Sequence, residues 1–152
     1  MHLAHYLGLV HRSELMLANS FREVASAHGD EPDVSVLCQR FAMQCDQHAA
    51  GLGPFVDRYA EDAPEEPERL HVDLFGGPRT GGLGLLRDLH DLYLMASQVD
   101  ISWTLIGQAA QGARDKALLE AVTSCDVETT KQLRWLRTRM KQAAPQALLV
   151  AS

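Results

Sequence analysis

The chain has 152 residues and a formal net charge of -6, with 46% hydrophobic and 22% charged residues. This length predicts a single domain, residues 1–152, built around one hydrophobic core. An acidic chain with scattered Lys and Arg has no basic field, so we expect no nucleic-acid and no membrane partner. No apolar run approaches the about 20 residues of a membrane span. Three cysteines without framework spacing favour a reducing, cytoplasmic location.

The first half of the chain predicts two long helices joined by a short turn. Apolar residues recur every three or four positions over about 2–28 and again over about 34–60, which is typical of helices with one buried face. Gly29 is suited to end the first helix, and Asp33 is suited to cap the second. Pro54 lies inside the second helix and should kink it or end it early.

The second half predicts two further helices after a long connection. Residues 61–82 are rich in Pro and Gly and read as a surface segment. The same helical spacing then returns over about 83–111 and 116–143, with Asp115 at the restart and Pro145 as the limit. A connection this long is uncommon in a compact domain but can run the length of a bundle. We therefore expect an all-α four-helix bundle of two hairpins, with its second and third helices parallel.

Potential metal ligands interrupt the apolar faces of all four helices. Buried polar groups need partners, and a buried carboxylate needs a cation, a metal ion or a raised pKa. These residues should converge near the middle of the bundle, because the helices have similar lengths. They are Glu14 on the first helix, Cys45 and His48 one turn apart on the second, Asp100 on the third, and Cys125 and Glu128 on the fourth.

Each of these residues also has a simpler interpretation when taken alone. Glu14 can lean to the bundle edge and pair with an arginine. An inward His such as His48 is more often a hydrogen-bonded core residue than a ligand, and a buried Cys behaves as a small hydrophobe. One or two potential ligands on every helix at similar depth favour a shared site.

This arrangement resembles the ferritin-like superfamily over nearly the whole chain. The stretch "VDISWTLIG" is also similar to the third-helix signature of its small bacterial stress-associated members. That family holds two irons with a Glu on the first and third helices and Glu-x-x-His on the second and fourth. The resemblance implies that the six residues are the metal ligands. Cys45 and Cys125 stand where the family has bridging Glu, Glu128 where it has His, and Asp100 is one methylene shorter, so a softer ion than iron is also compatible.

Three functions follow as hypotheses. The leading one is a ferritin-like bundle that binds an iron or zinc ion in its core through the six residues. The alternative is a degenerate, metal-free member with a structural or protein-interaction role. A redox enzyme using a metal or the thiols of Cys45 and Cys125 ranks last, because buried cysteines are usually inert.

Apolar residues outside the buried faces predict a homodimer. Tyr93 and Leu94 lie off the inward line of the third helix, and Leu9 and Leu15 lie off that of the first. Such residues can form a seam between two copies of the chain.

Overall fold

The computed structural model describes residues 2–60, 65, 70–71 and 73–150, and these residues form helices and no strand. The all-α prediction is confirmed. The helices are α1 (Leu3–Ala27), α2 (Pro32–Ala60), α3 (Gly81–Gly112) and α4 (Lys116–Pro145), followed by one π-helical turn, η1 (Gln146–Val150).

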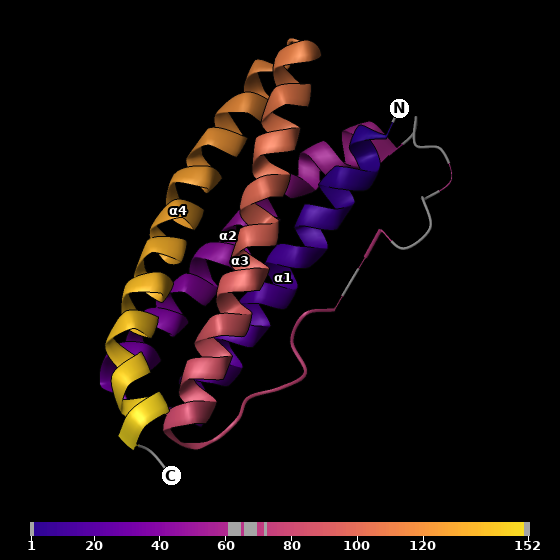
Figure 1. Cartoon of the computed structure of the whole chain (residues 1–152). Helices are drawn as coiled ribbons and strands as arrows, with labels where there is room; N and C mark the ends of the chain where they lie inside the picture. The colour runs from indigo at the N-terminus through magenta and orange to yellow at the C-terminus, as the bar shows by residue number, and fades with distance from the viewer. Residues whose placement is uncertain (1, 61–64, 66–69, 72, 151–152) are drawn as a thin grey trace.

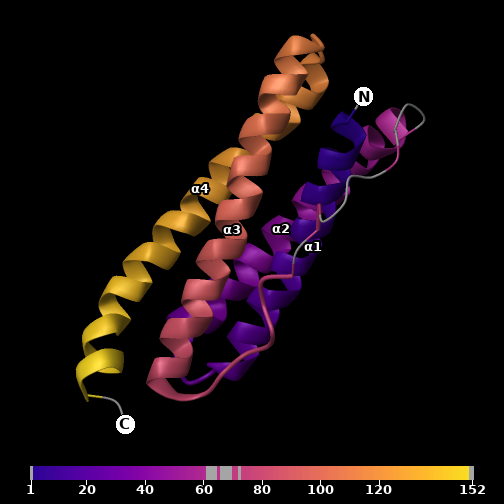
Figure 2. The ribbon, with the colours of Figure 1, turned by 45° about the vertical axis from the view of Figure 1, so that its right-hand side comes forward.

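The helices lie side by side as two antiparallel hairpins. In Figures 1 and 2, α1 runs away from the N-terminal end, α2 returns, α3 runs in the same direction as α2, and α4 returns beside the start of α3. The hairpins meet where α1 packs on α3 and α2 packs on α4. Within the described residues, α1 and α4 make no close backbone contact, and neither do α2 and α3, so these pairs lie diagonally.

One hydrophobic core runs through all four helices, because each helix contributes an apolar face. Each helix buries at least one large side chain completely: Phe21 on α1, Leu52 on α2, Trp103 on α3 and Leu136 on α4. A polar group on one of these faces therefore lies in a largely dry interior and needs a partner within the protein.

Three helix boundaries differ from the predicted ones. Helix α2 begins at Pro32 rather than after Asp33, because proline suits the first helical position. Helix α3 begins two residues early, at Gly81, whose φ of +74° glycine adopts without strain. Pro145 does not end the helical run, since the chain continues from it into η1.

Pro54 does not end α2 early. The helix continues to Ala60. Proline removes the hydrogen bond to the carbonyl of Ala50, and both residues are exposed, so water can satisfy that carbonyl.

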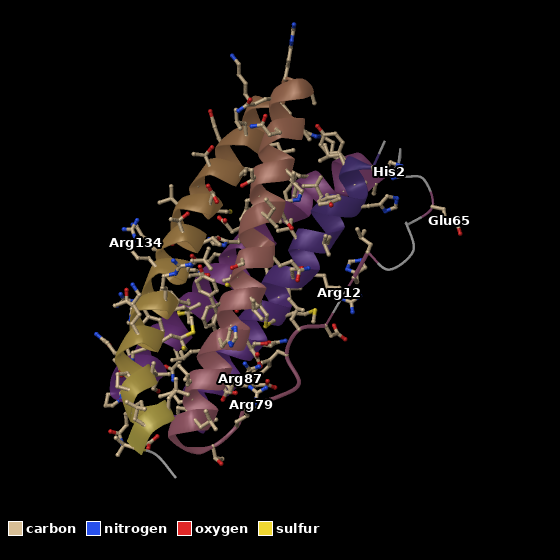
Figure 3. The ribbon with its side chains drawn as sticks, in the orientation of Figure 1. His2, Arg12, Glu65, Arg79, Arg87 and Arg134 are labelled. Carbon is tan, nitrogen blue, oxygen red and sulfur yellow. The ribbon has the colours of Figure 1, made fainter. Side chains whose placement is uncertain are left out.

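The end of the connecting segment is held by a network of ion pairs at the lower end of the bundle. Arg79 donates to Asp88 from its backbone N–H and from Nη1, both at 2.9 Å, and from Nη1 to Asp91 at 2.8 Å. On its other side, Asp88 Oδ2 lies 2.7 Å from Nε2 of His28, at the end of α1. Figure 3 places Arg79 and Arg87 together where the segment meets α3. The network joins α1, the segment and α3.

The outward apolar residues have mixed environments. Leu15 and Leu94 are exposed as expected, but Leu9 is buried at 6% exposure and cannot contribute to a seam. Tyr93 is half-buried, and its hydroxyl accepts a hydrogen bond from Arg137 at 2.7 Å. No helix in the described part of the chain is both long and apolar enough to cross a membrane.

Candidate functional site

The imidazole of His48 joins two carboxyl groups in the bundle interior. Its Nδ1 lies 2.8 Å from Oε2 of Glu14, and its Nε2 lies 2.8 Å from Oε1 of Glu128. Glu14 is fully buried and His48 is 4% exposed, whereas the side chain of Glu128 is 37% exposed. Three helices, α1, α2 and α4, therefore meet at one histidine, and one end of the triad reaches toward solvent.

Helical periodicity places these groups. Glu14 lies four residues after Val10 and three before Leu17, both buried, so its side chain leaves the helix on the apolar face. His48 lies four residues before the buried Leu52 on the inward face of α2. The carboxyl and imidazole groups are thus held in the core by the packing of their apolar neighbours.

Burial and mutual attraction set the protonation of the triad. Burial raises the pKa of Glu14 above its usual value, although its hydrogen bond to His48 opposes this. Burial alone would lower the pKa of His48, but hydrogen bonds and charges from Glu14 and Glu128 outweigh it and raise that pKa. The arrangement favours a shared proton, with a cationic imidazole between two carboxyl groups.

One oxygen of Glu14 has no hydrogen bond of ordinary geometry, although the thiol of Cys45 lies close enough to act on this carboxyl group as a weak donor. Oε1 is buried and unpaired, while Oε2 is bonded to His48. An unsatisfied buried acceptor costs roughly 1–3 kcal/mol. The core therefore contains a carboxylate oxygen with unused capacity to bind a donor or a cation.

Cys45 lies beside this group and is tied to α4. Its Sγ lies 3.9 Å from Oε1 and 3.8 Å from Nε2 of Gln132, and that amide also donates to Gln44 at 3.0 Å. Burial raises the pKa of the Cys45 thiol well above its usual value, and the charge of Glu14 adds to the effect. The thiol therefore stays protonated unless a cation replaces its proton.

Cys125 is near the triad but outside its hydrogen bonds. It is half-buried on α4, where burial, followed by the charges of Glu14 and Glu128, raises the pKa of its thiol to about 12. All three cysteines of the chain are free. The charges of both carboxylates of the triad therefore act on the thiol of Cys125, although this thiol does not bond to His48.

Asp100 was predicted to be a metal ligand beside the triad, but the neighbour that acts on its carboxyl group is Asp126. Its carboxyl group lies close to that of Asp126 on α4, and burial, followed by this neighbour, raises the pKa of Asp100 to about 6. One oxygen of Asp126 is buried without a donor, which a protonated Asp100 can supply. The third-helix acid thus belongs to a separate carboxyl pair between α3 and α4.

At the level of the triad, α3 contributes an aromatic ring. Trp103 is fully buried, and its ring meets the imidazole of His48 edge to face with centroids 6.2 Å apart. Its Nε1 is buried without a hydrogen-bond acceptor. An apolar wall with one free N–H therefore closes this side of His48.

Sequence reasoning missed the network at the lower end of the bundle. Asp88 stands three residues after Leu85 and four before Leu92, which is the inward spacing of α3, and it is fully buried. That spacing was a usable signal for a buried acid needing partners. Its partners, His28 and Arg79, come from outside the helix and have no such signal.

Comparison with known proteins gives no assignment. No family model matches the chain, and neither a curated protein nor a solved structure does. In the described residues, no three His, Cys, Asp or Glu side chains already form a group that could hold a metal ion.

The donor chemistry around His48 nevertheless suits one transition-metal ion. Glu14 supplies a carboxylate oxygen, His48 an imidazole nitrogen and Cys45 a sulfur, and mixed O, N and S sets bind Zn²⁺ and related ions rather than Mg²⁺ or Ca²⁺. The unpaired Oε1 of Glu14 is the free acceptor of this set. An ion at His48 would have to replace one of the two carboxyl groups on the ring.

Proposed function

We propose that this chain is a ferritin-like four-helix bundle that binds a divalent transition-metal ion, zinc or iron, in its core. The ion would be held at the group formed by Glu14, His48 and their neighbouring thiol and carboxyl groups. It would bind the oxygen of Glu14 that His48 leaves unpaired and take over from the imidazolium as the partner of this buried charge. The parallel direction of α2 and α3 supports the ferritin-like comparison.

The observation that carries the proposal is the state of Glu14. The side chain is fully buried, one oxygen is bonded to His48, and the other has no hydrogen bond of ordinary geometry among the described residues. An unpaired buried acceptor destabilises the folded state, and this cost is removed when a donor or a cation binds the oxygen. A metal ion can satisfy it while keeping the carboxylate charged.

Metal analysis of the purified protein tests the proposal. We expect Zn²⁺ or Fe²⁺ to bind the native protein, and Glu14→Gln to weaken binding on the order of 100-fold or more, since it removes a charged ligand. Glu120→Gln is the matched control, because Glu120 is an exposed acid on α4. Native protein that binds neither ion under reducing conditions would rule the proposal out.

A metal-free bundle is the second candidate, and one observation favours it. Both nitrogens of His48 already hold carboxyl groups at 2.8 Å, so the triad is internally paired. A buried ionic group of this kind is often replaceable by apolar residues with a gain of about 1–4 kcal/mol. The triple variant Glu14→Leu, His48→Leu and Glu128→Leu should then unfold at higher urea concentration than the native protein.

We also propose a homodimer in a reducing compartment such as the cytoplasm. The exposed side chains of Leu94, Ile101 and Leu105 on α3 support the dimer. The three free cysteines support the compartment, since a thiol that is to bind a metal must not be oxidised.

A further inference from the structure

We propose that the chain holds one ion rather than two, and that the two carboxylates on His48 have different roles. Glu14, Cys45 and Nδ1 of His48 are the ligands, while Glu128 positions the imidazole through Nε2. This inference rests on the proposed metal-binding function and specifies its ligand set and stoichiometry.

The two faces of His48 support the division of roles. A metal-bound histidine usually gives its second nitrogen to a carboxylate, which fixes the ring and its tautomer. His48 has one carboxyl group on each nitrogen, at equal distances of 2.8 Å. An ion can therefore displace one carboxyl group from its nitrogen while the other carboxyl group keeps the ring oriented.

Burial decides which carboxylate is the ligand. Glu14 is fully buried and has an unpaired oxygen, whereas Glu128 is 37% exposed and can be hydrated. A charge in a dry environment needs a counter-charge far more than one that reaches water. The ion therefore belongs on the Glu14 side of the ring.

Charge balance brings Cys45 into the set. Cys45 is buried on the same face of α2 as His48, one helical turn before it, and its thiol lies beside Gln132 of α4. A divalent cation with the carboxylate of Glu14 and the thiolate of Cys45 forms a neutral group, which is the least costly state to bury. The neutral imidazole supplies the third ligand.

A second ion lacks ligands. Two-iron bundles use four carboxylates and two histidines. Here Glu128 is bonded to the only imidazole of the triad, and the residue that α3 places beside that imidazole is the buried Trp103 rather than an acid. The donors that remain do not surround a second position.

Ion counting and cobalt spectra test the inference. We expect one Zn²⁺ per native chain, and with Co²⁺ an absorption band from sulfur-to-cobalt charge transfer. Cys45→Ser should remove that band, and Cys125→Ser, the matched control, should retain it. Circular dichroism of each variant without metal verifies that the bundle is folded.

The carboxylate roles are tested by two amide variants and one control. Glu128→Gln should keep one ion per chain and weaken binding about 10–100-fold, as expected for a positioning residue. Glu14→Gln should weaken binding more, and Asp100→Asn should leave stoichiometry and affinity unchanged.

The outcomes separate the two proposals. Two ions per native chain, an intact cobalt band in Cys45→Ser, or a larger loss from Glu128→Gln than from Glu14→Gln would overturn this inference while metal binding stands. Complete absence of binding by the native chain would instead overturn the proposed function, and this inference with it.

Discussion

The two oxygens of Glu14 differ because the bundle supplies only one partner for them. Oε2 meets Nδ1 of His48 at 2.8 Å, and Oε1 has no hydrogen bond of ordinary geometry. Burial raises the pKa of Glu14 although the nearby His48 lowers it, and the two carboxyl groups raise the pKa of His48 although burial lowers it. The folded protein therefore holds a proton here more tightly than the unfolded chain does.

The metal-free protein should lose stability as pH rises above about 6.5, the usual histidine value. The folded-state pKa of His48 is raised, so its contribution is complete below the unfolded pKa and disappears as pH rises through the folded one. The raised pKa of Glu14 acts in the same direction, starting from its ordinary value of 4.5. Urea unfolding with a chelator at pH 6.5, 7.5 and 8.5 measures the slope.

The double variant Glu14→Gln, His48→Gln should flatten this dependence, because it removes both groups of the triad whose pKa folding raises. His90→Gln, which changes an exposed histidine on α3, should leave the slope as in the native protein. A native free energy of unfolding that rises between pH 6.5 and 8.5 would contradict the assignment.

Asp100 and Asp126 form a second pair whose effect on stability has the same sign. The pKa of Asp100 is raised to about 6, so at neutral pH folding holds two carboxylates close together. Asp100→Asn should stabilise the protein at pH 8 by on the order of 0.5–1 kcal/mol, a modest value because the group is partly solvated. The gain should shrink below pH 6, where the native carboxyl is already protonated. Thermal unfolding at both pH values provides the comparison, and an equal gain at pH 5 and pH 8 would argue against charge repulsion.

At the scale of single residues, the spacing of apolar residues predicts which side chains point into the core better than it predicts which residues they contact there. The inward placement of Glu14 and His48 follows from steps of three and four residues. That Asp100 would meet Asp126 instead of His48 depends on how far α4 is rotated about its own axis, which no local pattern specifies. The approach of Glu128 to Nε2 of His48 depends on the same rotation.

At the scale of the helices, the start of α3 depends on contacts from elsewhere in the chain. Thr80 stands at the N-cap without a side-chain hydrogen bond. Asp88, two turns inside the helix, instead binds the backbone N–H and guanidinium of Arg79. It also binds His28, so the end of α1 and the start of α3 are fixed together. This explains how a segment of irregular backbone can end at a defined position.

Asp88→Ala should destabilise the protein by about 3–5 kcal/mol, because it leaves a buried His28 and an Arg79 without their shared partner. The control is Asp73→Ala, since Asp73 is a highly exposed acid whose nearest ion-pair contact, with Arg12, is 3.9 Å. That variant should change stability by less than about 0.5 kcal/mol. Urea unfolding of both variants measures the difference, and equal stabilities would show that the network has no structural role.

The helices themselves were predictable, and their ends were less so. Apolar spacing identifies all four, since every predicted core range overlaps an observed helix. Pro145 was expected to limit the last helix, but the chain enters a π-helical turn there, whose wider hydrogen-bond pattern differs from that of an α-helix. Boundaries depend on a few hydrogen bonds at each end, and these come largely from distant residues.

At the scale of the whole molecule, the distribution of contacts explains where the polar group lies. The two hairpins touch along α1 with α3 and α2 with α4, and Glu14, His48 and Glu128 cross this junction. The triad therefore links the two hairpins as well as forming the candidate metal site. A change in its ionic state should affect the packing of one hairpin against the other.

The outer face of α3 carries a row of exposed apolar residues. Leu94, Ile101 and Leu105 follow one another at steps of seven and four residues and share one side of the helix. They are 46%, 53% and 45% exposed, and apolar rows of this kind mark interaction surfaces more often than isolated exposed leucines do. A two-fold dimer would bury the same residues from both copies.

We expect the native chain to be a dimer in solution, and the double variant Leu94→Glu, Ile101→Glu to be a monomer, because it places like charges opposite each other across the seam. Val127→Glu is the matched control, since Val127 is 51% exposed on α4 and lies outside the row. It should remain a dimer. Light scattering coupled to size exclusion over a hundredfold range of concentration measures the mass of each. A native protein that stays monomeric at the highest concentration would rule out a dimer seam at this row.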